Sequence, residues 1–417
     1  MKKQKIISYM LIMIIICNMF SLTSYADDID EEENTKPEEI QKEVIETAGK
    51  VIEEPKLNAR SAIIFDRETK TVLYEKNSKE KRPMASTTKI MTAIVTLENA
   101  DLSKIVTISR KAAGTGGSTL GLKVNDKITL EHLLYGLMLC SGNDSAVAIA
   151  ETVGGSVEGF ASMMNKKAKE LGLTNTNFVT PHGLDNSNHY TTALELAKLT
   201  DYALKNKKFA LIVNTKNHTV YINGYPKQLN NTNELLGNME GVNGVKTGFT
   251  NGAGRCLVTS CTRNDKQIIT VVLGDDTKKM RTTDSIKLIE YAFQNFEDKN
   301  IEEIANKEFN NWKNINEGRI NVERKSKNSK IEVCMDEINN KILPVRKDKE
   351  NIKIEIDSKM NFEAPVEENK IIGTLKILID GKEIEKVNIR IKNKIEKKDL
   401  YEYFIEIINK YVNIKII

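Results

Sequence analysis

The chain has 417 residues, of which 40% are hydrophobic and 29% charged, and its formal net charge is +4. This length suits two or three domains, and the hydrophobic content is that of globular domains and excludes a polytopic membrane protein. Lys2, Lys3 and Lys5 carry three of the four excess positive charges and lie in a segment that we expect to be removed, which leaves +1. So small an excess gives no reason to propose nucleic acid as a partner.

Residues 1–26 have the features of a secretory signal peptide. The basic residues are followed by a largely apolar run from Ile6 to Phe20, and Ser24-Tyr25-Ala26 supplies small residues for cleavage. An uncleaved N-terminal anchor is the alternative, whereas lipid attachment at Cys17 is disfavoured because the residue before it is bulky. We therefore expect export to the outer face of the cytoplasmic membrane or to the cell wall.

Residues 27–55 are rich in aspartate and glutamate, which favours a flexible acidic tether over a packed segment. After it, Ser61 to Asp66 and Thr71 to Glu75 are typical of two strands joined by a polar turn. The first strong helical pattern follows at Ser86, where Ile90, Ala93, Ile94 and Leu97 recur at the spacing of one buried face.

Ser86 and Lys89 lie three residues apart at the start of this helix, and we expect Ser86 in its first turn, on the same face as Lys89. A serine hydroxyl is a weak nucleophile until a base accepts its proton. A lysine can be that base if burial and nearby cations lower its pKa. An amphipathic helix with an ordinary surface serine and lysine is the simpler interpretation of this motif alone.

Two further short motifs follow in the chain. Ser141-Gly142-Asn143 comes after a helical segment from about Leu130, and Lys246-Thr247-Gly248 begins a β-branched, strand-like run. Helices are predicted between them over 143–153, 159–171 and 192–204. Residues 256–262 and 267–273 predict a hairpin, and 284–296 a closing helix. Strands at both ends with helices between them predict one mixed sheet assembled from distant segments.

The order S-x-x-K, S-x-N, K-T-G is the signature of penicillin-binding proteins and class A β-lactamases. The chain resembles the serine-type D-alanyl-D-alanine carboxypeptidases, the low-molecular-mass penicillin-binding proteins. The resemblance also covers His182-Gly183-Leu184, Asn230 to Leu236 and Gly244 to Gly254. It implies the α/β transpeptidase-like fold, in the α+β to α/β class, with residues 56–300 as the catalytic domain and a small β-rich domain behind it.

The residue types suggest a role for each member of the motifs. Ser86 would attack the carbonyl carbon, Lys89 would take its proton, and Ser141 would relay a proton to the leaving amine. Asn143 would bind the substrate backbone and hold Lys89. Lys246 is a second cation that would favour a neutral Lys89 and attract a substrate carboxylate. Gly248 lacks a side chain, so an extended substrate could lie against its strand.

The resemblance adds roles that the residue types alone do not give. It implies an oxyanion hole formed by the backbone N–H groups of Ser86 and Phe249, and recognition of the terminal carboxylate by Thr247 and Arg281. It also implies structural packing, not base catalysis, for His182. The implied reaction removes the terminal D-alanine from peptidoglycan stem pentapeptides through an acyl-enzyme at Ser86, with β-lactams acylating the same serine and no metal or cofactor required.

The composition changes after about residue 300, where apolar and polar residues alternate as in half-buried antiparallel strands. Asp380-Gly381 is a hairpin signal. We expect a β-rich domain over 301–397 that serves as a spacer or docking unit. Apolar residues at helical spacing predict an amphipathic helix over 398–417 that is too short and too charged to span a bilayer. This helix suits a membrane surface, or else it docks on its own domain.

Of the five cysteines, Cys17 leaves with the signal, and Cys256 and Cys261 share one strand-like run too extended for a disulfide. We expect buried free thiols, and no cysteine or histidine spacing suggests zinc.

Two other functions share features of this sequence. A class A β-lactamase needs Glu-x-x-Leu-Asn between the second and third motifs, but here the string occurs at 54–58, before the nucleophile. A non-catalytic envelope or peptidoglycan-binding protein would not need all three motifs.

Overall fold

The computed structural model describes residues 36–39, 41–42, 53–316, 319–322, 331–348 and 352–414. The predicted signal peptide at 1–26 and most of the predicted tether at 27–55 lie outside these residues. The chain divides into two compact units, the first ending at Gln294 and the second beginning at Asn295.

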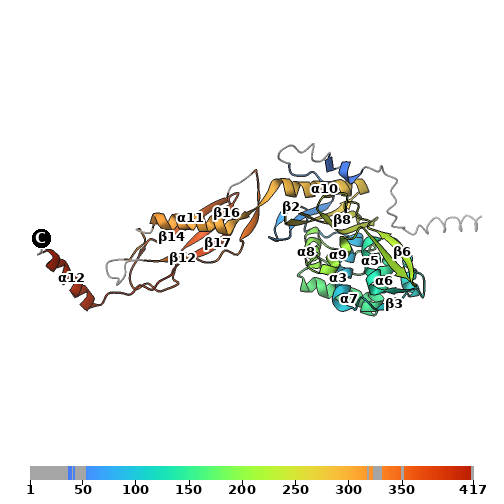
Figure 1. Ribbon diagram of the computed structural model, residues 1–417, viewed down its shortest axis with the longest axis horizontal. Coiled ribbons are helices and arrows are strands. Elements are labelled where there is room, and N and C mark those ends of the chain that lie inside the picture. The colour runs from blue at the N-terminus through green and yellow to red at the C-terminus, as the bar shows by residue number, and fades with distance from the viewer. Residues whose placement is uncertain are drawn as a thin grey trace, which may run out of the picture. The chain divides into compact units, whose positions relative to one another are not determined.

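The first unit is built on a five-stranded sheet with the strand order β2-β1-β9-β8-β7. The strands are β1 (Ser61–Asp66), β2 (Val72–Lys76), β7 (Val242–Thr250), β8 (Gly254–Arg263) and β9 (Lys266–Asp275). Figure 1 shows α10 (Lys278–Asn295) on one side of this sheet and a group of helices on the other. The first and last segments of the unit therefore meet in one sheet, as the sequence pattern predicts.

All four pairings in this sheet are antiparallel. The expected mixture of strand directions is therefore wrong for this sheet, although the fold class itself is confirmed. For three of the four pairings the physical reason lies in the connections, because β1 and β2, β7 and β8, and β8 and β9 are each joined by a short turn, and such a turn can only reverse the chain.

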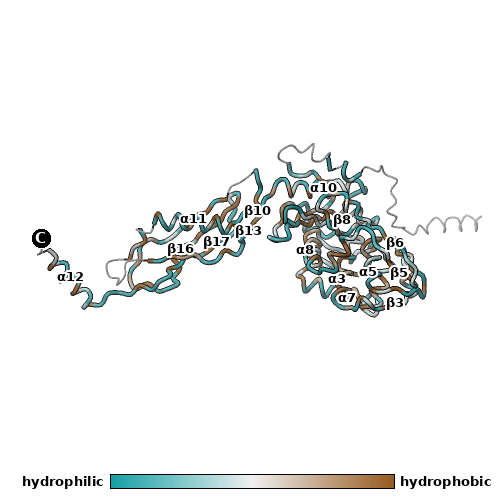
Figure 2. Tube along the Cα trace, viewed as in Figure 1, coloured by the Kyte–Doolittle hydropathy of each residue, from teal (hydrophilic) through white to brown (hydrophobic). Residues whose placement is uncertain are grey.

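The helical layer forms one continuous apolar core with the sheet, and Figure 2 shows apolar residues concentrated inside this unit. Its helices are α3 (Lys89–Asn99), α4 (Arg110–Ala113), α5 (Leu130–Leu139), α6 (Asn143–Gly154), α7 (Val157–Glu170), α8 (Ala193–Ala203) and α9 (Lys207–Val213). Two small hairpins accompany them: β3 (Ile105–Thr107) with β4 (Lys127–Thr129), and β5 (Asn217–Ile222) with β6 (Tyr225–Asn230).

The central helix α3 is more deeply buried than a one-faced pattern predicts, since every residue from Lys89 to Thr96 is buried. It is preceded by a 3-10 turn, η1 (Ala85–Thr88), which contains Ser86. The prediction that Ser86 lies in the first α-helical turn is therefore wrong by one turn. Side chains three residues apart are eclipsed in a 3-10 turn, so Ser86 and Lys89 face the same way.

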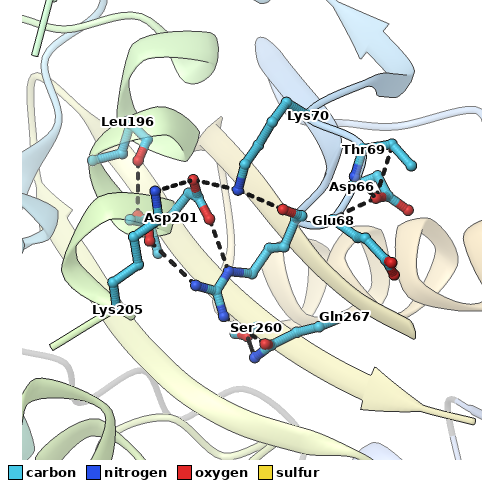
Figure 3. Close-up of polar contacts among 11 residues, drawn as sticks. Asp66, Glu68, Thr69, Lys70, Leu196, Asp201, Lys205, Ser260 and Gln267 are labelled. Carbon is cyan, nitrogen blue, oxygen red and sulfur yellow. Dashed lines mark hydrogen bonds and ion pairs between the residues drawn. The ribbon is translucent and has the colours of Figure 1, made fainter. Parts of the chain in front are cut away.

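Polar contacts join the turn after β1 to the helical layer at α8 (Figure 3). Asp201 on α8 accepts hydrogen bonds from Arg67 Nε at 3.0 Å and from Lys70 Nζ at 2.8 Å. The hairpin that begins the sheet is thus tied to the helix that packs against it.

The second unit contains an antiparallel sheet in the order β12-β17-β16-β14, and the hairpin between β16 and β17 turns at Asp380-Gly381 as predicted. Its elements are β10 (Phe296–Asn300), α11 (Ile301–Asn316), β11 (Asn321–Val322), β12 (Val333–Met335), β13 (Ile342–Arg346), β14 (Ile352–Ser358), β15 (Asn361–Phe362), β16 (Ile371–Ile379), β17 (Lys382–Ile391) and α12 (Leu400–Ile414).

Two features of this unit differ from the prediction. Its first strand, β10, pairs with β13, so the unit begins at Asn295 and not at 301. The helix α11 was not predicted, although Ile301, Ala305 and Phe309 recur at helical spacing and pack into the core of this unit.

The last helix, α12, leaves its apolar side chains exposed, including Leu400 at 90% and Tyr411 at 72%. It is thus not docked on the β-rich unit through these side chains. Among the helices of the described residues, none is long and apolar enough to cross a bilayer.

The cysteines that the structure describes are free thiols. Cys256 and Cys261 are buried in β8, and burial raises the pKa of each thiol to about 12. Cys140 and Cys334 are only partly buried.

Candidate active site

The site is organised around the pair that η1 and α3 place together. Lys89 Nζ lies 2.7 Å from Ser86 Oγ. The same nitrogen lies 2.7 Å from Asn143 Oδ1 and 3.0 Å from the carbonyl oxygen of His182. A neutral amine has two N–H donors and one lone pair, so it can donate to the two carbonyl-type oxygens and accept the Ser86 hydroxyl proton at once.

The surroundings of Lys89 also favour the neutral form. The side chain is fully buried, and this burial lowers the pKa of Lys89 well below its ordinary value, with the Lys246 cation lowering it further. The closest partners of its amine are a hydroxyl, an amide and a backbone carbonyl, none of which carries the negative charge that would hold the proton. Lys89 is therefore suited to accept a proton from Ser86.

The second motif occupies the turn between α5 and α6. Ser141 has a left-handed backbone (φ 61°), and its hydroxyl makes no hydrogen bond with the described residues. Asn143 opens α6, and its Nδ2 donates to the carbonyl of Gly116 at 2.8 Å. This contact fixes the orientation of the amide, so that Oδ1 faces Lys89.

Asp144, which sequence reasoning missed, holds the loop beside the second motif. Its buried carboxylate accepts the backbone N–H groups of Leu120, Gly121 and Leu122 at 2.8, 2.8 and 3.0 Å. The sequence signal for this role was the position of Asp144 in the first turn of a helix, where unpaired backbone N–H groups favour a carboxylate.

The third motif lies on β7, at the edge of the sheet. Lys246 is buried, and its Nζ donates to the carbonyl of Thr247 at 3.0 Å. The Thr247 hydroxyl lies 2.7 Å from the hydroxyl of Thr232. A Cβ atom on Gly248 would stand 3.0 Å from the backbone nitrogen of Ser86, so glycine keeps this N–H open. The next residue, Phe249, has the Arg255 guanidinium stacked over its ring at 3.7 Å.

One pocket collects most of the residues that the sequence singled out. Six of them line it: Ser86, Ser141, Asn143, Thr247, Gly248 and Phe249. Ser118, His182, Gly183, Leu184 and Thr250 complete the lining. Lys89 and Lys246 do not line the pocket but are buried next to residues that do.

Arg281 is the exception among the predicted site residues. It lies inside α10, which begins at Lys278 and not at the predicted residue 284. Its side chain is buried, and Nη2 donates to Glu234 Oε1 at 3.1 Å. Because the guanidinium already holds a carboxylate and does not line the pocket, the expected contact with a substrate carboxylate has no support in this geometry.

His182 contributes its backbone to the site through the contact with Lys89. Its imidazole Nδ1 accepts the N–H of Leu184 at 3.2 Å, and burial with the nearby Lys89 lowers the pKa of His182 to about 3. The ring is thus held by its own loop.

A serine in the turn that begins a buried helix, a lysine of lowered pKa beside it and the edge strand of a sheet at the same pocket define an active-site serine enzyme that forms acyl intermediates. Comparisons with known proteins specify the class. Residues 48–277 match the family model for D-alanyl-D-alanine carboxypeptidases, and residues 319–397 match the C-terminal domain of penicillin-binding protein 5. The chain belongs to the D-alanyl-D-alanine carboxypeptidase family.

Individual relatives agree with this assignment. The D-alanyl-D-alanine carboxypeptidase DacF of Bacillus subtilis is 35% identical over 84% of this chain and 89% of its own length. The crystal structure of the carboxypeptidase DacD from Francisella tularensis matches 83% of this chain and 95% of its own, with a TM-score of 0.68 and 26% identity. The Streptomyces K15 DD-transpeptidase matches 58% of this chain and 99% of its own, with a TM-score of 0.56 and 36% identity.

Proposed function

We propose that this protein removes the terminal D-alanine from peptidoglycan stem pentapeptides through an acyl-enzyme at Ser86. The observation that carries the proposal is the environment of Lys89, whose buried amine lies 2.7 Å from Ser86 Oγ and has neutral oxygens as its nearest partners. Membership of the family supplies the substrate class.

In the acylation step, Ser86 Oγ attacks the carbonyl carbon of the penultimate D-alanine while Lys89 accepts the hydroxyl proton. The developing oxyanion lies between the N–H groups of Ser86 and Phe249, where Gly248 leaves room for it. The C–N bond then breaks, and the proton passes from Lys89 through the Ser141 hydroxyl to the departing amine of D-alanine.

In the second step, a water molecule attacks the Ser86 ester, with Lys89 again accepting a proton, and the shortened stem peptide leaves. The same ester forms when a β-lactam ring opens on Ser86, so β-lactams are inhibitors that occupy the site.

The free carboxylate of the terminal D-alanine distinguishes this substrate from an internal peptide bond. We assign its recognition to the Thr247 hydroxyl and to the positive charge of Lys246 beneath it. Arg281 has no direct part in this assignment, since Glu234 holds it.

The experiment is an intact-mass measurement on the purified protein with benzylpenicillin and with a pentapeptide ending in D-Ala-D-Ala. A stable adduct of one penicillin per chain and release of one D-alanine per pentapeptide are expected, and both should be absent in Ser86→Ala. Rapid turnover of the penicillin without an adduct would instead favour a β-lactamase. An unmodified wild-type protein and an intact pentapeptide would favour a non-catalytic envelope protein.

We also propose where the protein acts. Residues 1–26 direct export, residues 27–55 form a tether, and the enzyme works at the outer face of the cytoplasmic membrane. The β-rich unit that begins at Asn295 serves as a spacer or docking unit, and the helix α12 lies in the membrane interface. The exposed Leu400, Phe404 and Tyr411 of α12 support this placement.

Deletion of residues 399–417 tests the membrane proposal. The truncated protein should lose its binding to vesicles that contain anionic lipid and keep its reaction with benzylpenicillin. An unchanged membrane-bound fraction would remove the proposed role of α12.

A further inference from the structure

His189 lies outside the three motifs, yet it is buried behind the turn that carries the nucleophile. It ends the loop from Phe178 to His189, and its ring packs edge-on against Phe178, with 5.7 Å between the ring centroids. Its Nε2 lies 2.7 Å from the hydroxyl of Thr88, the last residue of η1. A histidine far along the chain thus contacts the turn that contains Ser86.

The direction of the hydrogen bonds through His189 is fixed by its other nitrogen. Nδ1 accepts the backbone N–H of Val179 at 3.0 Å and lies 3.4 Å from the nitrogen of Thr180. A nitrogen that accepts an N–H carries no proton in a neutral imidazole, so the proton is on Nε2. Nε2 therefore donates to Thr88 Oγ1.

Because Thr88 Oγ1 accepts from His189, its own proton is available to a second acceptor. That acceptor is the carbonyl of Ala85, 2.8 Å away. Ala85 has a left-handed backbone (φ 46°), a conformation that residues other than glycine adopt rarely unless their surroundings hold them in it. The hydrogen bond holds the peptide group that leads directly into Ser86.

The loop also closes on the same carbonyl from its other side. A Cβ atom on Gly183 would lie 1.9 Å from the Ala85 oxygen, so the two backbones are in direct contact. Farther along α3, the Thr92 hydroxyl donates to the carbonyl of Pro181 at 2.6 Å. The loop thus contacts both η1 and α3, and His189 is its hydrogen-bonding link to the peptide that precedes Ser86.

We propose that His189 is a positioning residue for acylation, which acts through Thr88 to fix the Ala85–Ser86 peptide so that the Ser86 N–H and Oγ are both correctly oriented. This inference rests on the proposed function of Ser86. It assigns no contact between His189 and substrate. Rates are sensitive to such positioning, since a displacement of about 1 Å at the reacting atoms can cost about 100-fold.

The experiment compares matched variants of the full chain in the rate of acylation by a fluorescent penicillin and in kcat and KM for the pentapeptide. Thr88→Val removes the hydroxyl and is expected to lower the acylation rate about 10- to 100-fold. Thr88→Ser keeps the hydroxyl and should restore most of the rate. His189→Asn keeps an acceptor near Nδ1 but does not reach Thr88, so it should resemble Thr88→Val. His189→Gln can still donate to Thr88 and should recover part of the loss.

Two further measurements separate positioning from general stability. Thr96→Val removes a buried hydroxyl on α3 that donates to the carbonyl of Thr92, so it should lower the melting temperature without lowering the acylation rate comparably. The combination of Thr88→Val with His189→Asn should be no slower than the slower single variant, because both break one chain of hydrogen bonds.

The loss should appear in kcat with KM changed less than about threefold, because an interaction made in the transition state lowers kcat. The rise of the acylation rate with pH should keep its midpoint, because Lys89 keeps its partners. The inference would be overturned if both Thr88→Val and His189→Asn were acylated at the wild-type rate. It would also be overturned if their acylation rates fell no further than that of Thr96→Val at equal melting temperature. A wild-type protein that fails to react would instead contradict the proposed function.

Discussion

Lys89 and Asp201 are both buried ionisable residues of the first unit, but their surroundings are opposite. Asp201 accepts hydrogen bonds from two cations, Arg67 and Lys70, and a third, Lys205, lies 3.7 Å away (Figure 3). Lys89 has three neutral oxygens and a second cation, Lys246, near it.

The two environments shift the charge of each group in opposite directions. Burial alone would raise the pKa of Asp201, but the hydrogen bonds from Lys70 and Arg67 outweigh it and lower the pKa, so the charged form is stabilised. Burial and Lys246 lower the pKa of Lys89, so its charged form is destabilised. Removing one partner of a paired buried charge costs stability, whereas a cation kept without a counter-charge is available for chemistry.

The largest expected effect comes from replacing Lys89. Lys89→Met should lower the rate of acylation by benzylpenicillin about 1,000-fold, because it removes the base that lies 2.7 Å from Ser86 Oγ. The free energy of unfolding should fall by less than it does when a paired buried lysine is replaced, because methionine leaves two carbonyl oxygens without a donor but no buried charge without its counter-charge. Stopped-flow acylation and chemical denaturation measure the two quantities.

Lys266→Met is the matched control for this change. Lys266 is also a buried lysine, but it pairs with the carboxylate of Asp66 at 3.0 Å. Its replacement should cost about 3 kcal/mol of stability, because it leaves Asp66 without its cation, and should leave acylation near the wild-type rate. If Lys89→Met destabilised the protein as much as Lys266→Met, the contrast between paired and unpaired charges would be lost.

A second prediction concerns pH. Only neutral Lys89 can accept the Ser86 proton, so the acylation rate should rise with pH through a midpoint well below the ordinary lysine value. Lys246→Met removes the cation that helps to lower this pKa and should move the midpoint to higher pH. Lys208→Met, which removes a lysine paired with Glu131 on the surface, is the control and should leave the midpoint in place. A midpoint unaffected by Lys246→Met would contradict the assigned role of Lys246.

The sequence allowed the local parts of this site to be predicted and not the long-range parts. Ser86 and Lys89 are three residues apart, so any tight helical turn brings them together, and the mistaken turn type did not matter. The pairing of Arg281 with Glu234 and the contact of His189 with Thr88 join residues 47 and 101 positions apart. No local pattern indicates which distant partner a buried arginine or histidine will find.

The fold, like the site, has local features that the sequence predicts and long-range features that it does not. Strands and helices of the first unit follow from periodicity, and the turn at Asp380-Gly381 follows from residues that accept positive φ. The direction of each strand and the boundary at Asn295 depend on which strands pair with one another. Periodicity does not predict that pairing.

The third prediction tests the paired member of the comparison. Asp201→Asn should lower the free energy of unfolding by about 2 kcal/mol at pH 7, because hydrogen bonds from two cations to a charged oxygen are lost. The lowered pKa means that this contribution is present above the ordinary aspartate value and disappears as the pH falls through the folded-state value. Denaturation at pH 7 and in acid should therefore show a difference that shrinks with acidity, while acylation at pH 7 stays unchanged. A difference independent of pH would point to packing and not charge.

The smallest expected effect belongs to a third kind of buried charge, a carboxyl beside another carboxyl. Asp275 at the end of β9 and Asp284 on α10 are both fully buried, and Asp284 accepts hydrogen bonds from Asn58 and from the backbone of Ala59. Burial and then the adjoining Asp284 raise the pKa of Asp275 to about 8. Because its pKa is raised, Asp275 keeps a proton in the folded protein that it releases in the unfolded chain. The contribution of this proton to the free energy of unfolding is complete below the ordinary pKa of aspartate and is lost as the pH rises towards 8.

Asp275→Asn keeps a neutral donor beside Asp284 at every pH and should flatten this dependence. The variant should have the wild-type free energy of unfolding at acidic pH, and its advantage over the wild type should grow as the pH rises from the ordinary aspartate value towards 8 and then level off. Asp380→Asn, a change in the exposed turn between β16 and β17, should leave the pH dependence of the wild type in place. If the wild-type stability fell between pH 5 and pH 8 no more steeply than that of Asp275→Asn, Asp275 would already be ionised in the folded protein at pH 5. The Arg281 cation, which lowers the pKa of Asp275, would then outweigh burial and the adjoining Asp284.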